Sequence, residues 1–504
     1  MFGHLTLIGH LMSKVLLVHT NASGKVYQSL NSVSQIEPPI WCVMLASNLM
    51  EDYDVEILDA EADSLTPTET VQRIIESDAD LNVFVVYGQQ PSASTQNMAG
   101  VHQVLKTLKY EYPQYKTLLL GLYPSAVPRK TMEDENTDFV CQGEGPETLL
   151  GLLNSDLDNP SHLKRIPGLW YRDDDEIKYN KPAPLIQNLE QHLPGMAWDL
   201  LDMKSYRTAN WHAMTNDNDT SPFASLYTSL GCPYRCSFCC INAPFGNNNT
   251  ENGYGKPSFR FWNPNFMINE FDTIADMGIR NIKIADEMFV LYPKHFMKLC
   301  ELIIDRGYDF NIWAYARVDT VKPTYLDTLK KAGVNWLALG IESGNKNVRQ
   351  DVIKGKFSQP DIKEVVSTIQ QHDISVIGNY IFGLPEDNYE TMNQTLDLSM
   401  ELNCEFSNFY CTMAYPGSQL YLESNSEDLP NTYTGYSQHS YDCKPLPTKY
   451  LSSEEVLRFR DEAFYKCYEN KSYREFIHKK FGNETIKQQD NMLKIKLKRK
   501  LLGD

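Results

Sequence analysis

The chain has 504 residues and carries 65 acidic against 47 basic side chains, a formal net charge of −18. That length exceeds what one compact core supports and predicts two or three domains. The acidic balance argues against a nucleic-acid partner, because phosphate binding needs a basic surface. No apolar run approaches the length needed to span a bilayer, so we expect no transmembrane segment.

The first residues predict little structure. Residues 1–12 are expected to form a non-structural extension, with Met12 a plausible true start because a convincing strand follows at once. They lack the basic leading region of a signal peptide. Eleven cysteines without a secretion signal predict a reducing environment and a cytoplasmic protein.

From residue 13 to residue 156 the pattern alternates between strand and helix. Short apolar runs predict five strands, at Lys14–Thr20, Val55–Ala60, Leu81–Gly88, Lys116–Gly121 and Phe139–Gly143. Runs that are apolar on both faces and separated by helices predict a parallel sheet covered on both sides. The prediction is an α/β, doubly wound, flavodoxin-like domain whose ligand sits at the carboxyl ends of the strands. No glycine-rich nucleotide fingerprint follows its strands.

Residues 157–222 are predicted to be a linker that contains a β-hairpin around Asp173-Asp174-Asp175. A second alternation follows over residues 223–420. Six strands are predicted, at Ala224–Leu230, Asn281–Ala285, Asn311–Val318, Trp336–Glu342, Val376–Phe382 and Phe406–Met413. Six units are short of a full barrel, so we predict a partial (β/α)6 barrel of the TIM type, with its chemistry at the carboxyl ends of the strands.

Residues 421–504 lose this alternation. Residues 421–450 are rich in Ser, Asn, Tyr and Pro and predict a long loop that covers the substrate. From Ser452 the pattern is helical and opens on a capping box that ends at Glu455.

Three cysteines, Cys232, Cys236 and Cys239, fall within eight residues after the first barrel strand. Gly231 and Pro233 disfavour a helix there, so the thiols converge from a loop. Converging thiolates repel one another unless a metal or cluster neutralises them. Three ligands on a four-iron cube leave one iron open, as catalytic sites do.

Two other interpretations of the cysteine loop remain at this stage. A structural zinc site usually shows a second half, and none follows closely. A disulfide scaffold belongs to short secreted chains. Cys240 also offers an alternative third ligand to Cys239.

Polar residues end the other barrel strands. They are Asp286, Glu287, Arg317, Glu342 and Ser343. Singly, each is typical of a helix cap or surface ion pair, but together beside a cysteine cluster they indicate a site.

The cysteine loop resembles the Cys-x-x-x-Cys-x-x-Cys signature of the radical S-adenosylmethionine (radical SAM) superfamily, including the aromatic Phe238 before the third cysteine. The resemblance implies that Cys232, Cys236 and Cys239 hold a [4Fe-4S] cluster whose open iron binds SAM, with Cys240 a bystander. It implies that Asp286 or Glu287 contacts the methionyl amino group. Its implied contacts to the SAM carboxylate or ribose are Arg317, Glu342 and Ser343.

The amino-terminal domain is similar to the cobalamin-binding domain of the cobalamin-dependent subgroup, on Glu37-Pro38-Pro39, Leu58-Asp59-Ala60 and Gly143-Glu144-Gly145. The resemblance implies that cobalamin contacts Gly121, Ser125, Gly143, Glu144 and Gly145. Asp-x-His-x-x-Gly is absent, which implies a cobalt without a protein histidine below. Leu122 and Tyr123 depart from the usual Gly-Gly-x-x-Pro-Ser and could crowd a corrin, so a vestigial domain is the alternative.

Together these resemblances imply reductive cleavage of SAM and methylation of an unactivated carbon of a small or lipid-linked molecule, with electrons from an external donor such as flavodoxin or ferredoxin. Radical chemistry without methyl transfer and an iron–sulfur or cobalamin sensor without catalysis are the alternatives. Methylthiolation of transfer RNA is disfavoured, because only Cys42 and Cys141 lie in the first domain and the charge is negative. No catalytic side chain is assigned.

Overall fold

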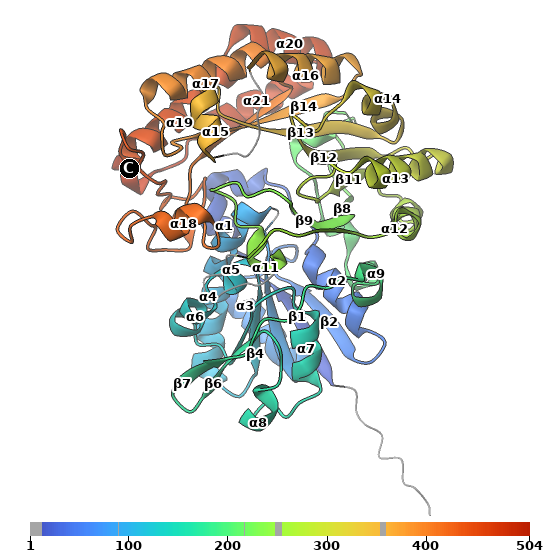
Figure 1. The fold of residues 1–504 in the computed structure, drawn as a ribbon, viewed down its shortest axis with the longest axis vertical. Coiled ribbons are helices and arrows are strands. Elements are labelled where there is room, and N and C mark those ends of the chain that lie inside the picture. Colours follow the sequence, from blue (N-terminus) through green and yellow to red (C-terminus); the bar gives the residue numbers. More distant parts are fainter. Residues whose placement is uncertain (1–12, 89, 216, 247–254, 353–358) are drawn as a thin grey trace, which may run out of the picture.

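The structure is a computed structural model that describes residues 13–504 except 89, 216, 247–254 and 353–358. The extension expected over residues 1–12 lies outside the described residues. Two sheets organise the described chain, one in the amino-terminal part and one above it in the view of Figure 1.

The first sheet has seven strands in the order β2-β1-β3-β4-β5-β6-β7. Its five parallel strands are β1 (Lys14–His19), β2 (Asp54–Asp59), β3 (Leu81–Val86), β4 (Thr117–Gly121) and β5 (Phe139–Cys141). The principal helices between them are α2 (Ile40–Leu49), α3 (Pro67–Ser77), α4 (Ser94–Glu111) and α7 (Pro146–Leu153).

Alternate residues of the strands enter different cores. Leu17 belongs to the core that contains α2 and α7, while Leu16 belongs to the core that contains α3 and α4. Because side chains alternate across a strand, helices on both faces require strands that are apolar throughout. The doubly wound fold is therefore confirmed.

The predicted hairpin is formed by β6 (Leu169–Asp173) and β7 (Glu176–Tyr179). It extends the first sheet in antiparallel fashion, since β6 pairs with β5. Trp170 is fully buried and stacks on Tyr179 at 4.6 Å between ring centroids. The amino-terminal sheet thus continues beyond residue 156.

The second sheet has six parallel strands in the order β15-β14-β13-β12-β11-β8. They are β8 (Phe223–Leu226), β11 (Asn281–Ile284), β12 (Asn311–Arg317), β13 (Val334–Glu342), β14 (Ser375–Phe382) and β15 (Phe406–Cys411). The helices that follow these strands are α12 (Pro264–Asp276), α13 (Pro293–Arg306), α14 (Pro323–Lys331), α16 (Gln359–Gln371) and α17 (Tyr389–Leu402). The partial barrel is confirmed, with β8 and β15 as its edges.

The carboxyl-terminal segment covers the β15 edge. Its helices are α19 (Ser453–Tyr468), α20 (Lys471–Phe481) and α21 (Asn483–Lys494), at the top of Figure 1. Gln438, in the long loop before α19, accepts a hydrogen bond from the Cys411 N–H at 2.8 Å and donates one to the Cys411 carbonyl at 2.9 Å. The loop therefore satisfies backbone groups of an edge strand that would otherwise stay unpaired.

Buried ion pairs join the two halves of the molecule. Lys283 on β11 donates to both oxygens of Glu37, at 2.9 and 3.0 Å, with both side chains nearly inaccessible. Ser225 on β8 donates to the same carboxylate at 2.6 Å. Within the described ranges, no helix combines the length and apolar character needed to cross a bilayer.

Candidate functional site at the carboxyl edges of the two sheets

The cysteine loop begins at the end of β9 (Ser229–Gly231), which pairs with β10 (Phe259–Phe261). Gly231 has φ = 82°, and a Cβ there would lie 2.4 Å from the Ser258 carbonyl oxygen. Only glycine fits that backbone without a clash. The β9–β10 pair and this glycine direct the chain into the loop that carries the thiols.

The three signature thiols differ from the other cysteines in exposure. Cys232, Cys236 and Cys239 are partly exposed, whereas Cys240 and the remaining seven cysteines are buried. The three also interact with one another electrostatically. Burial, the Glu287 carboxylate and the Cys236 thiol raise the pKa of Cys232 to about 12.

Among the described residues, no three His, Cys, Asp or Glu side chains gather closely enough to hold a single metal ion. An iron–sulfur cluster does not need such convergence, because each cysteine ligates a different iron. Three partly exposed thiols that interact electrostatically with one another fit the cluster.

The adjacent carboxylates Asp286 and Glu287 have different environments. Asp286 is 1% exposed and accepts hydrogen bonds from the Thr228 N–H, the Thr228 hydroxyl and the Ser229 hydroxyl, each at 2.6 Å. Glu287 is partly exposed and has no hydrogen-bond partner among the described residues. Burial raises the pKa of Glu287 to about 8 although Lys283 opposes the shift. Asp286 fixes the strand end, and Glu287 is available to a ligand.

Arg317 joins the barrel edge to the cysteine loop. Its guanidinium lies 4.0 Å from the ring centroid of Tyr234, within the loop. It also forms a two-point pair with Asp319, at 2.9 and 2.8 Å. A cation stacked on an aromatic face is attracted by the ring quadrupole, so Arg317 holds the loop in place.

Glu342 and Ser343 follow an irregularity at the end of β13. Glu342 has φ = 62°, a conformation that is uncommon for residues other than glycine, and burial raises the pKa of its carboxyl to about 7. Ser343 is fully buried and accepts a hydrogen bond from the Asn345 N–H at 3.1 Å. The structure brings Glu342 to the edge with Arg317, while Ser343 supports the following turn.

The predicted residues of the first sheet are engaged with one another. The Ser125 hydroxyl bonds the Gly143 N–H and carbonyl at 3.1 and 3.2 Å. Gly121 and Gly145 both have positive φ angles and pack tightly, since a Cβ would meet Val86 or Leu120 at under 2.5 Å. These contacts build the end of β4 and the β5–α7 turn.

Leu122 and Tyr123, which depart from the usual motif, do not project from the domain. They are 0% and 2% exposed, and each belongs to the core on one face of the sheet. Their side chains therefore do not stand in the path of a ligand.

Glu144 connects the amino-terminal domain to the β9–β10 pair. Arg260 on β10 donates to both of its oxygens, at 2.6 and 3.0 Å, and the Ile186 N–H adds a third bond at 2.7 Å. Both side chains of the ion pair are nearly buried. The carboxylate that the resemblance assigned to a cofactor is paired with a partner 116 residues away.

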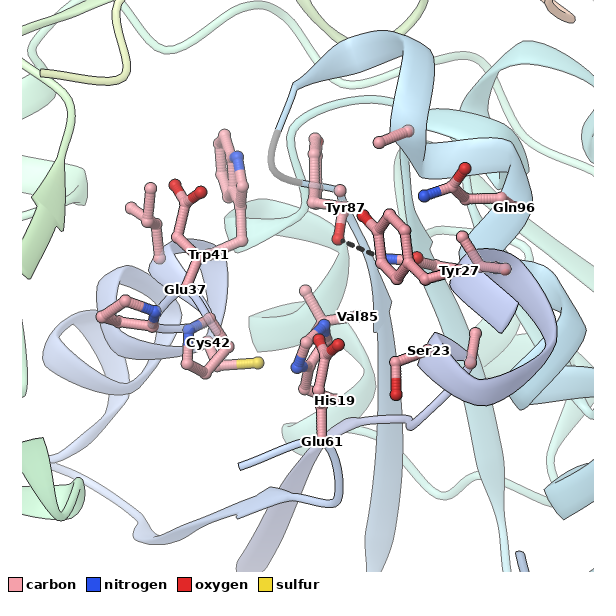
Figure 2. A pocket seen from close by; sticks show the side chains of 18 of the residues that line it. His19, Ser23, Tyr27, Glu37, Trp41, Cys42, Glu61, Val85, Tyr87 and Gln96 are labelled. Atoms are coloured by element: carbon pink, nitrogen blue, oxygen red, sulfur yellow. Dashed lines mark hydrogen bonds between the residues drawn. The ribbon is translucent and has the colours of Figure 1, made fainter. Parts of the chain in front are cut away.

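The sequence predicted a ligand at the carboxyl ends of the strands, and a pocket lies at the ends of β1 and β3, but sequence reasoning did not single out His19 or Glu61 within it. Figure 2 shows His19 and Glu61 at its centre, between Glu37 and Trp41 on one side and Tyr27 and Gln96 on the other. His19 bonds Asp59 through Nδ1 at 3.0 Å, and the Tyr206 hydroxyl donates to the same carboxylate at 3.0 Å. The sequence signal that could have identified this pocket was His19, a histidine at the carboxyl end of the first strand.

The charged groups in this pocket shift one another's pKa values. Burial alone would lower the pKa of His19, but the Asp59 charge and hydrogen bond raise it to about 9. Burial raises the pKa of Glu61 to about 7, against the attraction of His19. The Tyr87 hydroxyl is buried without a hydrogen-bond partner among the described residues. A buried orphan donor in a pocket is a group that a ligand can satisfy.

A larger cavity, of about 650 Å³, lies between the barrel interior, the amino-terminal domain and the carboxyl-terminal helices. Trp313 and Tyr315 on β12 and Tyr410 on β15 contribute part of its wall, and Ser92 and Gln96 contribute from the first domain. The barrel strands, the amino-terminal domain and the carboxyl-terminal helices thus share one cavity.

Comparison with known proteins gives two family matches. The profile of the radical SAM superfamily matches residues 226–399, and the profile of the B12 binding domain matches residues 29–153. An uncharacterised methyltransferase of Pyrococcus horikoshii is 26% identical, over 90% of this chain and 92% of that protein. An anaerobic magnesium-protoporphyrin IX monomethyl ester cyclase of Synechocystis is 25% identical, over 69% of this chain and 65% of that protein.

Among solved structures, the radical SAM methyltransferase TsrM from Kitasatospora setae, with cobalamin and a [4Fe-4S] cluster bound, has a similar fold. The TM-score is 0.61 at 17% identity, and the alignment covers 82% of this chain and 74% of that chain.

Proposed function

Because the chain belongs to the radical SAM superfamily and carries a B12-binding domain, we propose that it methylates an unactivated carbon of a small or lipid-linked molecule. Membership implies SAM, a [4Fe-4S] cluster and cobalamin as cofactors. When bound, these groups supply an electron, a radical source and a methyl carrier, which protein side chains alone do not provide.

The cysteine loop is our proposed cluster site. Cys232, Cys236 and Cys239 would hold the cluster, because they combine partial exposure with mutual proximity. Cys240 is 1% exposed and packs inside the protein, which leaves it out of the set.

We assign the SAM amino group to Glu287. Its carboxylate has no competing hydrogen bond among the described residues and interacts with the cysteine thiols, whereas the bonds of Asp286 are already used. Arg317 and Glu342 lie at the same edge and would contact other parts of SAM. These side chains bind and orient the cofactor, while the surrounding walls exclude water.

For cobalamin we propose the ends of β1 and β3. The orphan Tyr87 hydroxyl and the Glu37–Trp41 wall border that pocket, and Gln96 borders both it and the larger cavity. At the end of β4, by contrast, Ser125 and Gly143 are hydrogen-bonded to each other, and the chain continues directly into a short buried helix, α5 (Leu122–Ala126).

The observation that carries the proposal is a partly exposed cysteine trio next to Glu287, whose carboxylate has no hydrogen-bond partner among the described residues, in a chain that also carries a B12-binding domain. The test is anaerobic incubation of the reconstituted protein with methyl-labelled SAM, hydroxocobalamin and reduced flavodoxin. We expect both S-adenosylhomocysteine and 5′-deoxyadenosine. Release of 5′-deoxyadenosine without S-adenosylhomocysteine would contradict methyl transfer.

That contradictory outcome would favour the second candidate, radical chemistry without methyl transfer. The similarity to a cyclase over 69% of this chain supports keeping it. A Cys236→Ala protein serves as the control in both cases, because it should release neither product.

A further inference from the structure

The wall of the 650 Å³ cavity has the opposite charge balance to the whole chain. Of the charged lining residues in the described part of the chain, Lys283, Arg460 and Lys496 are basic and Asp461 is acidic, and the charge of Lys283 is already paired with Glu37. The chain as a whole has a formal net charge of −18. A basic cavity within an acidic protein selects for an anionic occupant, because field lines concentrate in a cleft with low-dielectric walls.

Arg460 on α19 is the centre of this charge. It is 7% exposed, and two of its three guanidinium nitrogens have partners. Nε donates to the Phe409 carbonyl at 2.8 Å, and Nη1 donates to Asp461 at 2.7 Å. The remaining nitrogen has no partner among the described residues and is not sealed off from the cavity.

Asp461 does not neutralise Arg460, because it is shared. Arg499 binds both oxygens of Asp461, each at 2.9 Å, so two guanidinium groups face one carboxylate. The Asp504 carboxylate binds only the main-chain N–H of Arg499, at 2.7 Å. Burial, and to a lesser extent the two arginines, lowers the pKa of His439, another lining residue, to about 3.

Aromatic rings line part of the remaining cavity wall, among polar and aliphatic side chains. These rings come from distant parts of the chain and include Trp211, Trp313, Tyr315, Tyr410, Tyr415 and Phe464. Trp211 meets Trp313 edge to face at 5.3 Å. Such walls bury apolar groups and leave orientation to a few polar contacts. Gln488 on α21 adds a buried amide oxygen without a partner among the described residues.

We propose that this cavity holds the substrate as an amphipathic anion, with its apolar body against the aromatic rings and an oxyanion, carboxylate or phosphate, on Arg460. This assignment of the substrate class rests on the proposed function. A guanidinium with a free N–H is suited to an oxyanion, and a buried charged hydrogen bond discriminates strongly against an uncharged analogue. Arg460 is thus a residue that determines specificity.

Two fluorescent probes that share a ring system test the proposal. One is 1-anilinonaphthalene-8-sulfonate, and the other is N-phenyl-1-naphthylamine, which lacks the sulfonate. Both are titrated into the full-length protein without SAM or reductant. We expect Arg460→Gln to weaken binding of the sulfonate probe about 10- to 100-fold, as for a lost charged hydrogen bond, and to leave the neutral probe within about twofold.

Matched variants keep the result interpretable. Arg458→Gln, on the same helix but half exposed and paired with Glu454, should change neither probe. Gln488→Glu adds a negative charge to the wall without touching Arg460 and should also weaken only the sulfonate probe. Equal affinities for the sulfonate probe in the wild type and both wall variants would overturn the proposal, as would parallel loss of both probes in Arg460→Gln and Gln488→Glu.

The phosphate of cobalamin is a second possible source of the oxyanion. If loading with hydroxocobalamin displaces the sulfonate probe and Arg460→Gln weakens cobalamin binding, Arg460 serves the cofactor and the proposal is overturned. Because probe binding needs no turnover, a protein that binds the probes as expected but forms no S-adenosylhomocysteine would contradict only the proposed methyl transfer.

Discussion

The carboxyl edges of the two sheets carry similar polar residues, but these residues have different roles at the two edges. At the barrel edge, Glu287 and the signature thiols remain partly exposed, and Glu287 has no hydrogen-bond partner among the described residues. At the first sheet's edge, Ser125, Gly143 and Glu144 are bonded to other parts of the chain.

This difference teaches that a polar residue at a strand end has two competing uses. Asp286 and Glu144 hold the scaffold through multiple hydrogen bonds, and only their less constrained neighbours face the open space. Buried polar groups must be satisfied, so a carboxylate that ends inside the protein acquires partners from it. Burial and partners, rather than position in a motif, separate scaffold from site.

The largest expected effect lies in the cysteine doublet. Cys239→Ala should abolish SAM cleavage and lower the iron content of the anaerobically reconstituted protein, because a partly exposed thiol ligand is lost. Cys240→Ala should retain both, since that thiol is buried at 1% exposure and removing it leaves the cluster ligands intact. Iron and sulfide analysis checks this, and equal iron loss in the two variants would contradict the assignment of the third ligand.

The next largest expected effect tests the scaffold role of Glu144. Glu144→Ala leaves the buried Arg260 guanidinium without its ion-pair partner, which should lower the free energy of unfolding by about 3–5 kcal/mol. Glu301→Gln, in an exposed pair with Lys298, should change it by less than about 1 kcal/mol. Urea unfolding measures both. A Glu144 variant of normal stability that has lost cobalamin affinity would instead make Glu144 a cofactor contact.

At the barrel edge, the adjacent residues Asp286 and Glu287 are expected to differ in the same way, with one supporting the fold and the other binding a ligand. Glu287→Gln should weaken SAM binding by about 10- to 100-fold with little loss of stability, because it removes one charged hydrogen bond to the ligand. Asp286→Asn should mainly lower stability, since three bonds at 2.6 Å from the β8–β9 segment are disturbed. Calorimetric titration with SAM and thermal unfolding separate the two, and the reverse pattern would exchange their roles.

The smallest expected effect is a pH dependence of stability at the carboxyl edge of the first sheet. The folded-state pKa of His19 is about 9, above its ordinary value of 6.5. The stabilisation from its pairing with Asp59 is therefore fully present below about pH 6.5 and is lost as the pH rises through about 9. The stability deficit of His19→Gln relative to the wild type should therefore shrink as the pH rises from about 6.5 to about 9. A deficit that stays constant with pH would show that His19 does not titrate as proposed.

The order of elements followed from the sequence because it depends on local pattern. Apolar runs such as Leu81–Val86 have one stable environment, a strand covered on both faces, and helix stops such as Arg306-Gly307 are read from adjacent residues. The cysteine loop was equally accessible, since its ligands lie within eight residues and need no distant partner.

The sequence by itself thus determined the two domains' fold class, the family resemblance and the prediction of the cluster cysteines. Only the tertiary structure decided that, among the described residues, Glu287 lacks the hydrogen bonds that Asp286 has, that Arg260 pairs with Glu144, and that Arg460 lines a cavity with Trp313. These outcomes depend on contacts between residues tens to hundreds of positions apart. Local periodicity specifies which side of an element is buried, but it does not specify what meets that side.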